Sequence, residues 1–490
     1  MKKYVLAIDQ GTTSTRAILF DRQQNIIEVA QKEVANFFPQ PGYVEQDANE
    51  IWLSTLAVIS EIFASGEYLP SEVESVGISN QRETTVVWNK KTGMPVYHAI
   101  VWQSRQTNDL VDMYRAKGVE EIIRKKTGLV LDPYFSATKI RWILDNAPNL
   151  KDEDDLIFGT IDTWLLWKLT NGKVHATDVT NASRTLLFNI HTLTWDDELL
   201  DIFGVKRSML PEIKQSADDF GYIEAYHFFN VSCPIRGVAG DQQAALFGQS
   251  CFAKGNVKNT YGTGGFLLIN TGEKPIISNN GLLTTVAWSI DGKVSYALEG
   301  SIFVSGSLIQ WLRDGLKFFD NAAKTESIAT SVDSSNGVII IPAFTGLGAP
   351  YWNKDCQGAI FGLTRGIDYR HIVRAALESM AYQSKDLIHI MEEDTGIKIE
   401  SIKVDGGASA NKFLLQFQSD ILEMPVIKSA FTETTALGVA RLAGLKSGFY
   451  TMDDFNNESN TIFKPQRDHE EVVSKYARYK RAVEACIGFK

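Results

Sequence analysis

Three polar turns in this sequence place an aspartate close to glycine at the end of an apolar segment. The aspartates are Asp9, Asp241 and Asp405. A carboxylate at the end of a strand can hold Mg²⁺ directly or through water, and glycine lets the backbone come close to a phosphate group. In the first turn, the residues with amides, hydroxyls or a guanidinium that can face phosphate oxygens are Thr12, Thr13, Ser14 and Arg16. A plain hairpin turn would use the same residue types, so the motif alone leaves both interpretations open.

The better-known nucleotide and catalytic motifs are absent from the sequence. A GxxxxGK[ST] loop is excluded because Lys173 and Lys293, which follow glycines, are both followed by valine. The glycines at 262 and 264 do not complete a GxGxxG pattern, since position 267 is leucine. The DFG triplet at 219–221 has no HRD partner, and no GxSxG is present. Phosphate binding would therefore depend on the strand–Asp–Gly turns.

Apolar segments around these turns predict a mixed α/β protein. In the first half, the expected strands are 4–8, 17–20, 26–34, 73–78 and 84–88, and the expected helix is 47–64. In the second half, the expected strands are 234–239, 258–261, 266–269 and 401–404, with helices at 371–393 and from 412. Within 371–393, one apolar face is made by Val373, Ala376, Leu377 and Met380, which predicts core packing. The recurring turns predict two related domains, 1–250 and 251–490, that face a cleft.

Composition and charge exclude several classes of protein. The 490 residues are 44% hydrophobic and 22% charged, as in an ordinary globular protein. The net charge of −10, with no basic tract, argues against nucleic acid or an anionic membrane as the main partner. No apolar run is long enough to span a bilayer. The four cysteines are far apart without a CxxC pair, which predicts free thiols in a cytoplasmic protein.

Longer strings show that the chain resembles the FGGY family of carbohydrate kinases from end to end. The strings that carry the resemblance are AIDQGTTSTRA from Ala7, NQRETTVVW from Asn80, IVWQSR from Ile100, DPYFSATKIRW from Asp132, GDQQAALFGQ from Gly240, NTYGTGGF from Asn259, PAFTGLGAPYW from Pro342 and VDGGASAN from Val404. The resemblance implies the two-domain actin/Hsp70/hexokinase-like (RNase H-like) ATPase fold with an interdomain cleft. It implies a polyol site and phosphate loop in 1–250 and an adenosine site in 251–490.

The motifs are most similar to those of family members that phosphorylate glycerol. They imply transfer of a phosphoryl group from Mg-ATP to glycerol, giving sn-glycerol 3-phosphate, the first step of glycerol catabolism. The residues implied to hold the polyol are Arg82, Glu83, Trp102, Tyr134, Asp241, Gln242 and Phe266. Those implied to contact the nucleotide are Thr12, Thr13, Ser14, Arg16, Thr263, Gly306, Gln310, Gly407 and Asn411, with Asp9 near the metal ion.

These residue types suit the implied reaction. A polyol offers hydroxyls that both donate and accept, and adjacent Arg82 and Glu83 supply complementary partners. A site built to bond particular hydroxyls rejects analogues that lack them. Asp241 is the expected general base for the 3-hydroxyl. Taken singly, the aromatic residues would suit a core, and Asp241 or Asn411 would suit a helix cap.

A departure from part of the family lies at 221–230, which reads GYIEAYHFFN. Members inhibited by fructose 1,6-bisphosphate resemble one another in a Gly-rich, Arg-bearing loop here, so such inhibition is not expected. The Tyr-His-Phe stretch resembles members that are activated when the phosphocarrier protein HPr phosphorylates the histidine. This resemblance implies that His227 is a regulatory site and that HPr is a partner. The resemblance of the whole chain implies that the enzyme is a homodimer or homotetramer.

Two other functions fit part of this pattern. One is a kinase for another polyol or ketose, with the same fold and mechanism. The other is an actin- or Hsp70-like ATPase without a small-molecule acceptor, which would turn over ATP regardless of glycerol. The pairing of Arg82–Glu83 with the aromatic residues Trp102 and Phe266 favours the three-carbon triol.

Overall fold

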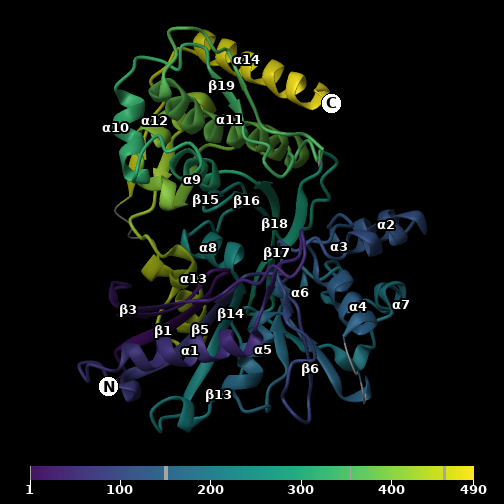
Figure 1. The fold of residues 1–490 in the computed structure, drawn as a ribbon. Coiled ribbons are helices and arrows are strands. Elements are labelled where there is room, and N and C mark those ends of the chain that lie inside the picture. Colours follow the sequence, from purple (N-terminus) through teal and green to yellow (C-terminus); the bar gives the residue numbers. More distant parts are fainter. Residues whose placement is uncertain (1, 148–149, 151–152, 354, 456–459, 490) are drawn as a thin grey trace.

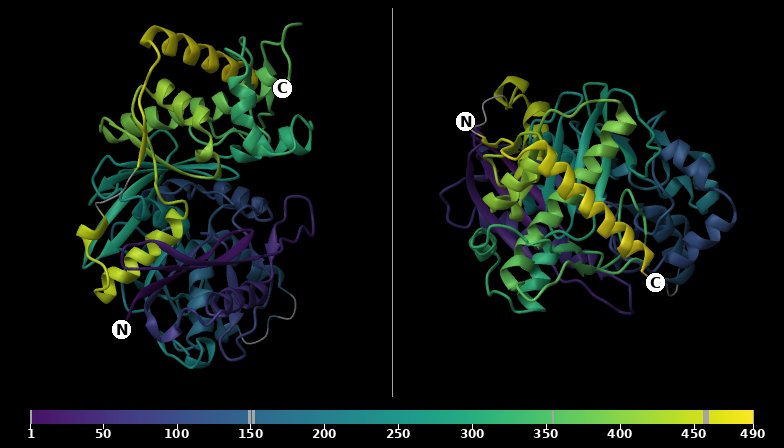
Figure 2. Two further views of the ribbon diagram at one scale, coloured as in Figure 1. Left: turned by 90° about the vertical axis from the view of Figure 1, so that its left-hand side faces the viewer. Right: turned by 90° about the horizontal axis from the view of Figure 1, so that it is seen from above.

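The structure is a computed structural model that describes residues 2–147, 150, 153–353, 355–455 and 460–489. Its framework is two mixed β-sheets, each covered by helices (Figure 1). The first sheet joins purple and blue strands from the start of the chain to two teal strands within 222–240, and the second sheet comes from the C-terminal half. The left view of Figure 2 shows the same two-part arrangement from another side.

The N-terminal sheet aligns the ends of three parallel strands. In spatial order its strands are β13 (Tyr222–Ile223), β14 (Cys233–Gly240), β5 (Val73–Asn80), β1 (Tyr4–Gln10), β2 (Ser14–Phe20) and β3 (Ile26–Glu33). Strand β5 runs parallel to both β1 and β14, and its Asn80 is level with Gln10 and Gly240. The residues that follow these strands therefore emerge at one edge of the sheet.

The C-terminal sheet repeats this plan. In spatial order its strands are β17 (Leu283–Ile290), β18 (Lys293–Ile302), β16 (Gly265–Gly272), β15 (Val257–Tyr261), β21 (Ile402–Gly406), β22 (Val426–Lys428) and β23 (Thr461–Phe463). Strands β15 and β21 are parallel, with Tyr261 level with Gly406. The glycine turn after β15 and the glycine loop after β21 consequently lie side by side.

Helices pack on both sheets and connect them. Their bounds are α1 (Ala48–Ile62), α2 (Asn108–Ala116), α3 (Glu120–Thr127), α4 (Ser136–Asn146), α5 (Ile161–Leu169), α6 (Val179–Ala182), α7 (Asp197–Phe203), α8 (Asp241–Gly248), α9 (Gly306–Asp314), α10 (Thr325–Thr330), α11 (Tyr369–Thr395), α12 (Lys412–Leu422), α13 (Thr434–Ser447) and α14 (His469–Gly488). The short strands outside the two sheets are β4 (Glu45–Gln46), β6 (Val86–Asn89), β7 (Ala99–Ile100), β8 (Leu156–Gly159), β9 (Ala176–Asp178), β10 (Phe188–Asn189), β11 (Thr194–Trp195), β12 (Glu212–Lys214), β19 (Ile339–Ile341) and β20 (Ala359–Phe361).

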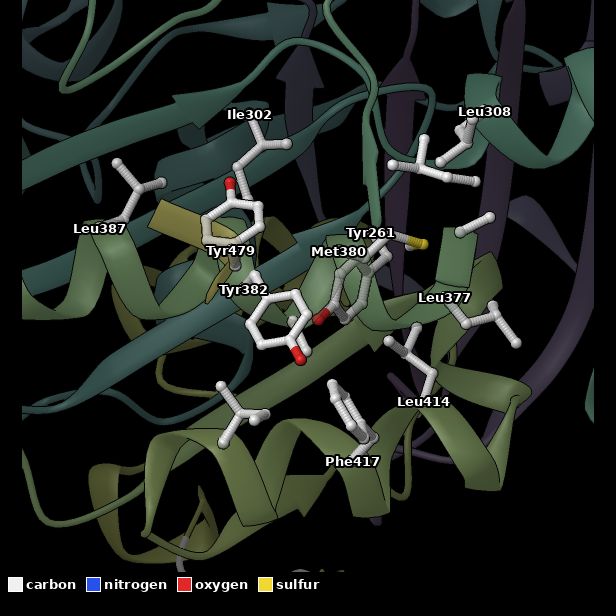
Figure 3. Close-up of a cluster of buried hydrophobic side chains, with 14 of the residues drawn as sticks. Tyr261, Ile302, Leu308, Leu377, Met380, Tyr382, Leu387, Leu414, Phe417 and Tyr479 are labelled. Atoms are coloured by element: carbon white, nitrogen blue, oxygen red, sulfur yellow. The ribbon is translucent and has the colours of Figure 1, made fainter. Parts of the chain in front are cut away.

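The core of the C-terminal half confirms the predicted apolar helix face. Leu377 and Met380 of α11 lie among buried side chains from the sheet, α12 and α14 (Figure 3). Val373 and Ala376 are buried in the same cluster. This packing fixes α11 and α12 beneath the strands that carry the glycine turns.

Helix α13 crosses from the C-terminal half of the chain to the N-terminal sheet. It packs on β5, β14 and α8, and Figure 1 shows it beside the purple strands. Its Gly438 approaches α8 so closely that a Cβ atom there would lie 1.9 Å from the Ala244 carbonyl oxygen. The expected boundary near residue 250 stays a prediction, and the structure adds this helix to the N-terminal packing.

Two further expectations have a structural counterpart. All four cysteines are buried, and none of them forms a disulfide bond. In the described part of the chain, no helix is both long enough and apolar enough to cross a membrane.

Candidate active site

Asp241 lies where the parallel strands of the N-terminal sheet end. It is the first residue of α8, directly after β14. Its Oδ1 accepts a hydrogen bond from the Gln242 backbone N–H at 2.8 Å and lies 3.2 Å from Arg82 Nε. The Asp241 side chain is 31% exposed, whereas that of Arg82 is 2% exposed. The carboxylate is thus held from one side and open on another.

Arg82 is fixed by residues from both halves of the chain. Its Nη1 and Nη2 donate to the two carboxylate oxygens of Glu299 on β18, at 2.5 Å and 3.1 Å. Nη1 also donates to Gln243 Oε1 at 3.2 Å, and Nη2 to the Tyr134 hydroxyl at 3.4 Å. Bidentate contacts of this kind fix the plane of the guanidinium.

Glu83 is the second predicted polyol residue, and it is buried beside Arg82. Its φ of +62° is in the left-handed region, which is uncommon for a residue other than glycine. Arg184 Nε donates to Glu83 Oε1 at 2.6 Å, and Arg184 Nη2 donates to Glu299 Oε1 at 2.9 Å. The Glu83 carbonyl accepts from Lys139 Nζ at 3.3 Å. The turn after β5 is therefore strained locally and held by several partners.

The three predicted aromatic residues lie together. Trp102 makes edge contacts with Tyr134 and Phe266, with ring centroids 5.7 Å and 6.2 Å apart. Trp102 Nε1 donates to Thr12 Oγ1 at 2.9 Å. The structure thus joins the aromatic group, whose Phe266 comes from the C-terminal sheet, to the turn that follows Asp9.

A buried lysine borders Gln242. Lys258 of β15 donates from Nζ to Gln242 Oε1 and, at 2.9 Å, to Thr260 Oγ1. Burial lowers the pKa of Lys258 to about 8, although Asp405 and other acids oppose this shift. Burial also raises the pKa of Asp241, while Arg82 and Lys258 partly offset that rise.

The turn after β1 presents polar groups to the same region. The Gly11 N–H donates to the Ser14 carbonyl at 2.9 Å and closes the turn, while the Thr13 side chain is exposed. Arg16 is engaged by Glu433 at 2.7 Å and by Gln31 at 2.9 Å. The predicted donors therefore surround one tight turn, and Arg16 is already paired.

The predicted nucleotide residues of the C-terminal half come from three neighbouring segments. The Thr263 carbonyl accepts from the backbone N–H groups of Ser305 and Ser307, which ties the glycine turn to the start of α9. Gly306 begins α9 so close to Gly262 that a Cβ atom would lie 2.5 Å from the Gly262 carbonyl oxygen. Gln310 is exposed on the same helix.

The third segment is the loop after β21. A Cβ atom at Gly407 would meet nothing within 4 Å, so this glycine borders open space. Asn411 caps α12 by accepting from the Leu414 N–H at 2.9 Å, and it donates to Thr325 Oγ1 at 3.1 Å. The helix-cap interpretation of Asn411 is confirmed, and its nucleotide contact stays a prediction.

The donor set near Asp9 fits a hydrated magnesium ion. Burial and the neighbouring Asp241 carboxylate raise the pKa of Asp9 to about 7, and a bound cation would relieve this repulsion. Among the described residues, no group of three or more His, Cys, Asp or Glu side chains could enclose a metal ion. Mg²⁺ held at Asp9 would therefore complete its shell with water and phosphate oxygens, as is usual for this ion.

His227 lies away from this group of residues. It ends a short 3-10 turn (Ala225–His227) that precedes β14, whereas Asp241 follows the same strand. Its ring packs edge-on against Trp52 at 4.9 Å. Burial and the Lys168 charge lower the pKa of His227. Its neighbour Tyr226 is 59% exposed, so the turn is at the surface.

Sequence reasoning missed the buried partners of the predicted residues. These are Arg184, Gln243, Lys258 and Glu299. Arg184 lies in the string TNASRTLLFNIHTLTWD from Thr180, which also resembles the family, Gln243 lies in GDQQAALFGQ and Lys258 directly precedes NTYGTGGF, so these three had a signal in the sequence. Glu299 lies in no such string. Nothing local distinguishes a buried charge of this kind from a solvated one, because burial depends on contacts between distant segments.

Comparison with known proteins agrees with this geometry. Residues 4–248 match the N-terminal domain and residues 257–447 match the C-terminal domain of the FGGY family of carbohydrate kinases. Glycerol kinases of Thermus thermophilus and Geobacillus kaustophilus are each 56% identical over 496 aligned residues, which cover 100% of both chains.

Solved structures agree as well. The crystal structure of Plasmodium falciparum glycerol kinase with ADP is 38% identical, with a TM-score of 0.92 over 99% of this chain and 98% of that one. A xylulose kinase from Lactobacillus acidophilus, at 21% identity and a TM-score of 0.88 over 99% of each chain, shares the fold. These matches confirm the expected two-domain α/β fold of the actin/hexokinase-like type. The chain belongs to the FGGY family of carbohydrate kinases.

Proposed function

We propose that this protein transfers the γ-phosphoryl group of ATP to a terminal hydroxyl of glycerol and forms sn-glycerol 3-phosphate. The observation that carries the proposal is the partly open Asp241 carboxylate, held by Arg82 Nε at 3.2 Å. Around it are the predicted polyol residues, including the Trp102–Phe266 contact between the two halves. The full-length similarity to glycerol kinases supports the choice of acceptor.

In the proposed reaction, Asp241 accepts the proton of the attacking hydroxyl. The hydroxyl oxygen forms a bond to the γ-phosphorus while the bond to the β–γ bridging oxygen breaks, and ADP leaves. Arg82 donates to the polyol oxygens, and Glu83 accepts from them. The aromatic group of Trp102 and Phe266 covers the carbon chain. Proton acceptance by a positioned carboxylate contributes about 10²–10⁴-fold to such reactions.

The turn at 11–14 and the glycine segments of the C-terminal half would hold the nucleotide. Thr12, Thr13 and Ser14 supply donors to phosphate oxygens, and the open space at Gly407 leaves room beside the loop after β21. Mg²⁺ at Asp9 would neutralise charge on the phosphates. The remaining predicted nucleotide contacts are Arg16, Thr263, Gly306, Gln310 and Asn411.

Release of ADP from Mg-ATP tests the proposal directly. The purified protein is assayed alone and with glycerol, dihydroxyacetone, xylulose or gluconate. Strong stimulation by glycerol over the larger sugars is expected, because buried donors and acceptors discriminate sharply between hydroxyl patterns. Stimulation by another acceptor would keep the phosphoryl transfer but contradict the choice of glycerol. Turnover indifferent to every acceptor would favour an ATPase without a small-molecule substrate.

We further infer that phosphorylation of His227 by HPr activates the enzyme. What supports this is the surface turn at 225–227, whose Tyr226 is 59% exposed, and the strand β14 that runs from this region to Asp241. A phosphoryl group there would lie near Lys168, whose charge already influences His227. Incubation with HPr, enzyme I and phosphoenolpyruvate is expected to label His227 and raise activity. Unlabelled His227 with unchanged activity would contradict this.

A cytoplasmic homodimer or homotetramer completes the proposal. Four buried cysteines that form no disulfide bond suit a reducing compartment. Light scattering of the purified protein is expected to give two or four times the 54.6 kDa chain mass. A single chain mass at assay concentration would contradict the oligomer.

A further inference from the structure

The five N–H donors of Arg82 lie in the plane of its guanidinium and point to two groups of partners. Nη1 is occupied by Glu299 Oε2 and Gln243 Oε1, and Nη2 by Glu299 Oε1. The remaining edge, made by Nε and the second Nη2 hydrogen, faces Asp241 at 3.2 Å and Tyr134 at 3.4 Å. In a guanidinium, Nε and one Nη nitrogen share an edge, so these two donors point the same way.

That second edge is the one available to a substrate hydroxyl. The Tyr134 contact of 3.4 Å is long for a hydrogen bond, and Asp241 is partly exposed. By contrast, Glu299 accepts two hydrogen bonds from Arg82, at 2.5 Å and 3.1 Å, and is 0% exposed. Glu299 therefore holds the end of the guanidinium made by Nη1 and Nη2. The edge made by Nε and Nη2 can exchange its present contacts for hydrogen bonds to a substrate hydroxyl.

We propose that Glu299 is a positioning residue that orients Arg82 toward the polyol and Asp241, and thereby sets the affinity for the acceptor. This rests on the proposed function. Glu299 lies on β18 of the C-terminal sheet, whereas Arg82 follows β5 of the N-terminal sheet. The orientation of a substrate-binding group in one half thus depends on a carboxylate from the other.

The same carboxylate reaches two more predicted polyol residues through Arg184. Arg184 Nη2 donates to Glu299 at 2.9 Å, and Arg184 Nε donates to Glu83 at 2.6 Å. The Arg184 guanidinium also lies 5.5 Å from the centre of the Tyr134 ring. One acid from β18 therefore supports the positions of Arg82, Glu83 and Tyr134 together.

The alternation of two arginines and two glutamates explains how this arrangement tolerates burial. Arg82, Glu83, Arg184 and Glu299 are all at most 2% exposed. A buried charge is stable when it is paired and hydrogen-bonded, and removing one partner is costly. Replacing Glu299 by glutamine keeps its shape but removes the charge and one of its two acceptor oxygens.

The test compares Glu299→Gln and Glu299→Asp with the matched control Glu378→Gln. Glu378 forms a buried pair with Arg374 at 3.0 Å on α11 and contacts none of the polyol residues. Glu299→Gln is expected to raise the KM for glycerol about ten- to hundred-fold, the equivalent of one lost charged hydrogen bond. The KM for ATP should stay within about two-fold, since Glu299 has no contact with the predicted nucleotide residues.

Two further measurements separate positioning from general destabilisation. Thermal unfolding with and without glycerol should show protection in the wild type and Glu378→Gln and lose it in Glu299→Gln. Glu299→Asp, which keeps the charge on a shorter side chain, should recover part of the glycerol affinity. Recovery by aspartate would not follow from a purely steric role.

Four outcomes would overturn the proposal. A folded Glu299→Gln variant with unchanged KM for glycerol does so, and so do equal rises in both KM values. If Glu378→Gln loses thermal protection by glycerol to the same extent as Glu299→Gln, the loss comes from general destabilisation of the fold and not from the position of Arg82. If wild-type protein neither binds nor phosphorylates glycerol, the proposed function falls and this inference falls with it, a pattern distinct from an active wild type.

Discussion

Among single residues, the proposed phosphoryl transfer depends most on the carboxylate of Asp241. Asp241→Asn keeps the size of the side chain and an oxygen for Arg82 Nε, but an amide cannot accept the substrate proton. The kcat is expected to fall about 10²–10⁴-fold. ATP affinity, measured by calorimetry, should change little, because the predicted nucleotide residues are elsewhere. A variant that retains most of its kcat would remove Asp241 from the role of base.

The pH dependence of the reaction follows from the same group. A base must be ionised, so the rate falls as pH drops through its pKa. Burial raises the pKa of Asp241, so the fall should begin at higher pH than for an ordinary aspartate near about 3.9. The check is the acid limb of kcat/KM for glycerol. In Lys258→Met, which removes a cation that lowers this pKa, the limb should move to still higher pH. An unmoved limb contradicts this assignment.

The sequence motifs predicted which side chains come together in the site, but not the buried charged residues that hold these side chains in place. Trp102, Tyr134 and Phe266 come together as the family motifs imply. Glu299 and Lys258 escaped prediction, because a charged residue in a strand becomes a buried partner only through tertiary contacts. The roles of the predicted residues stay predictions until variants are measured.

At the scale of elements, the contact between α8 and α13 holds the Asp241 helix in place. Gly438→Ala would put a methyl group 1.9 Å from the Ala244 carbonyl oxygen. Overpacking of this kind is expected to cost about 1–3 kcal/mol or more and to lower the melting temperature. Gly366→Ala is the control, since a Cβ atom there meets nothing within 4 Å. Equal melting temperatures for both variants would contradict the tight helix contact.

Element prediction succeeded for the existence of the strands and fell short at their ends. The strand expected at 4–8 runs to Gln10, and the strand expected at 73–78 runs to Asn80. The backbone hydrogen bonds between parallel strands continue past the last apolar side chain into polar residues. A prediction based on apolar side chains therefore ends these strands too early. The placement of α13 on the N-terminal sheet could not be predicted, because an apolar helix face in the sequence does not indicate which of the two sheets the helix packs against.

At the scale of the whole molecule, the two sheets make one site from both halves of the chain. Strand β14 links the His227 turn to Asp241 over eight residues, a span of about 25 Å. Phe266, Lys258 and Glu299 come from the C-terminal sheet and contact residues of the N-terminal half. Polyol binding and the relative placement of the halves are therefore coupled through direct contacts.

Identification of the product is the sharpest test of the proposed phosphoryl transfer to glycerol. The protein is incubated with Mg-ATP and ¹³C-labelled glycerol, and the mixture is followed by ³¹P and ¹³C NMR. We expect one new phosphomonoester on a terminal carbon of glycerol, formed in equal amount to ADP and assigned as sn-glycerol 3-phosphate by a stereospecific dehydrogenase. ADP accompanied by inorganic phosphate, with glycerol unchanged, would contradict it.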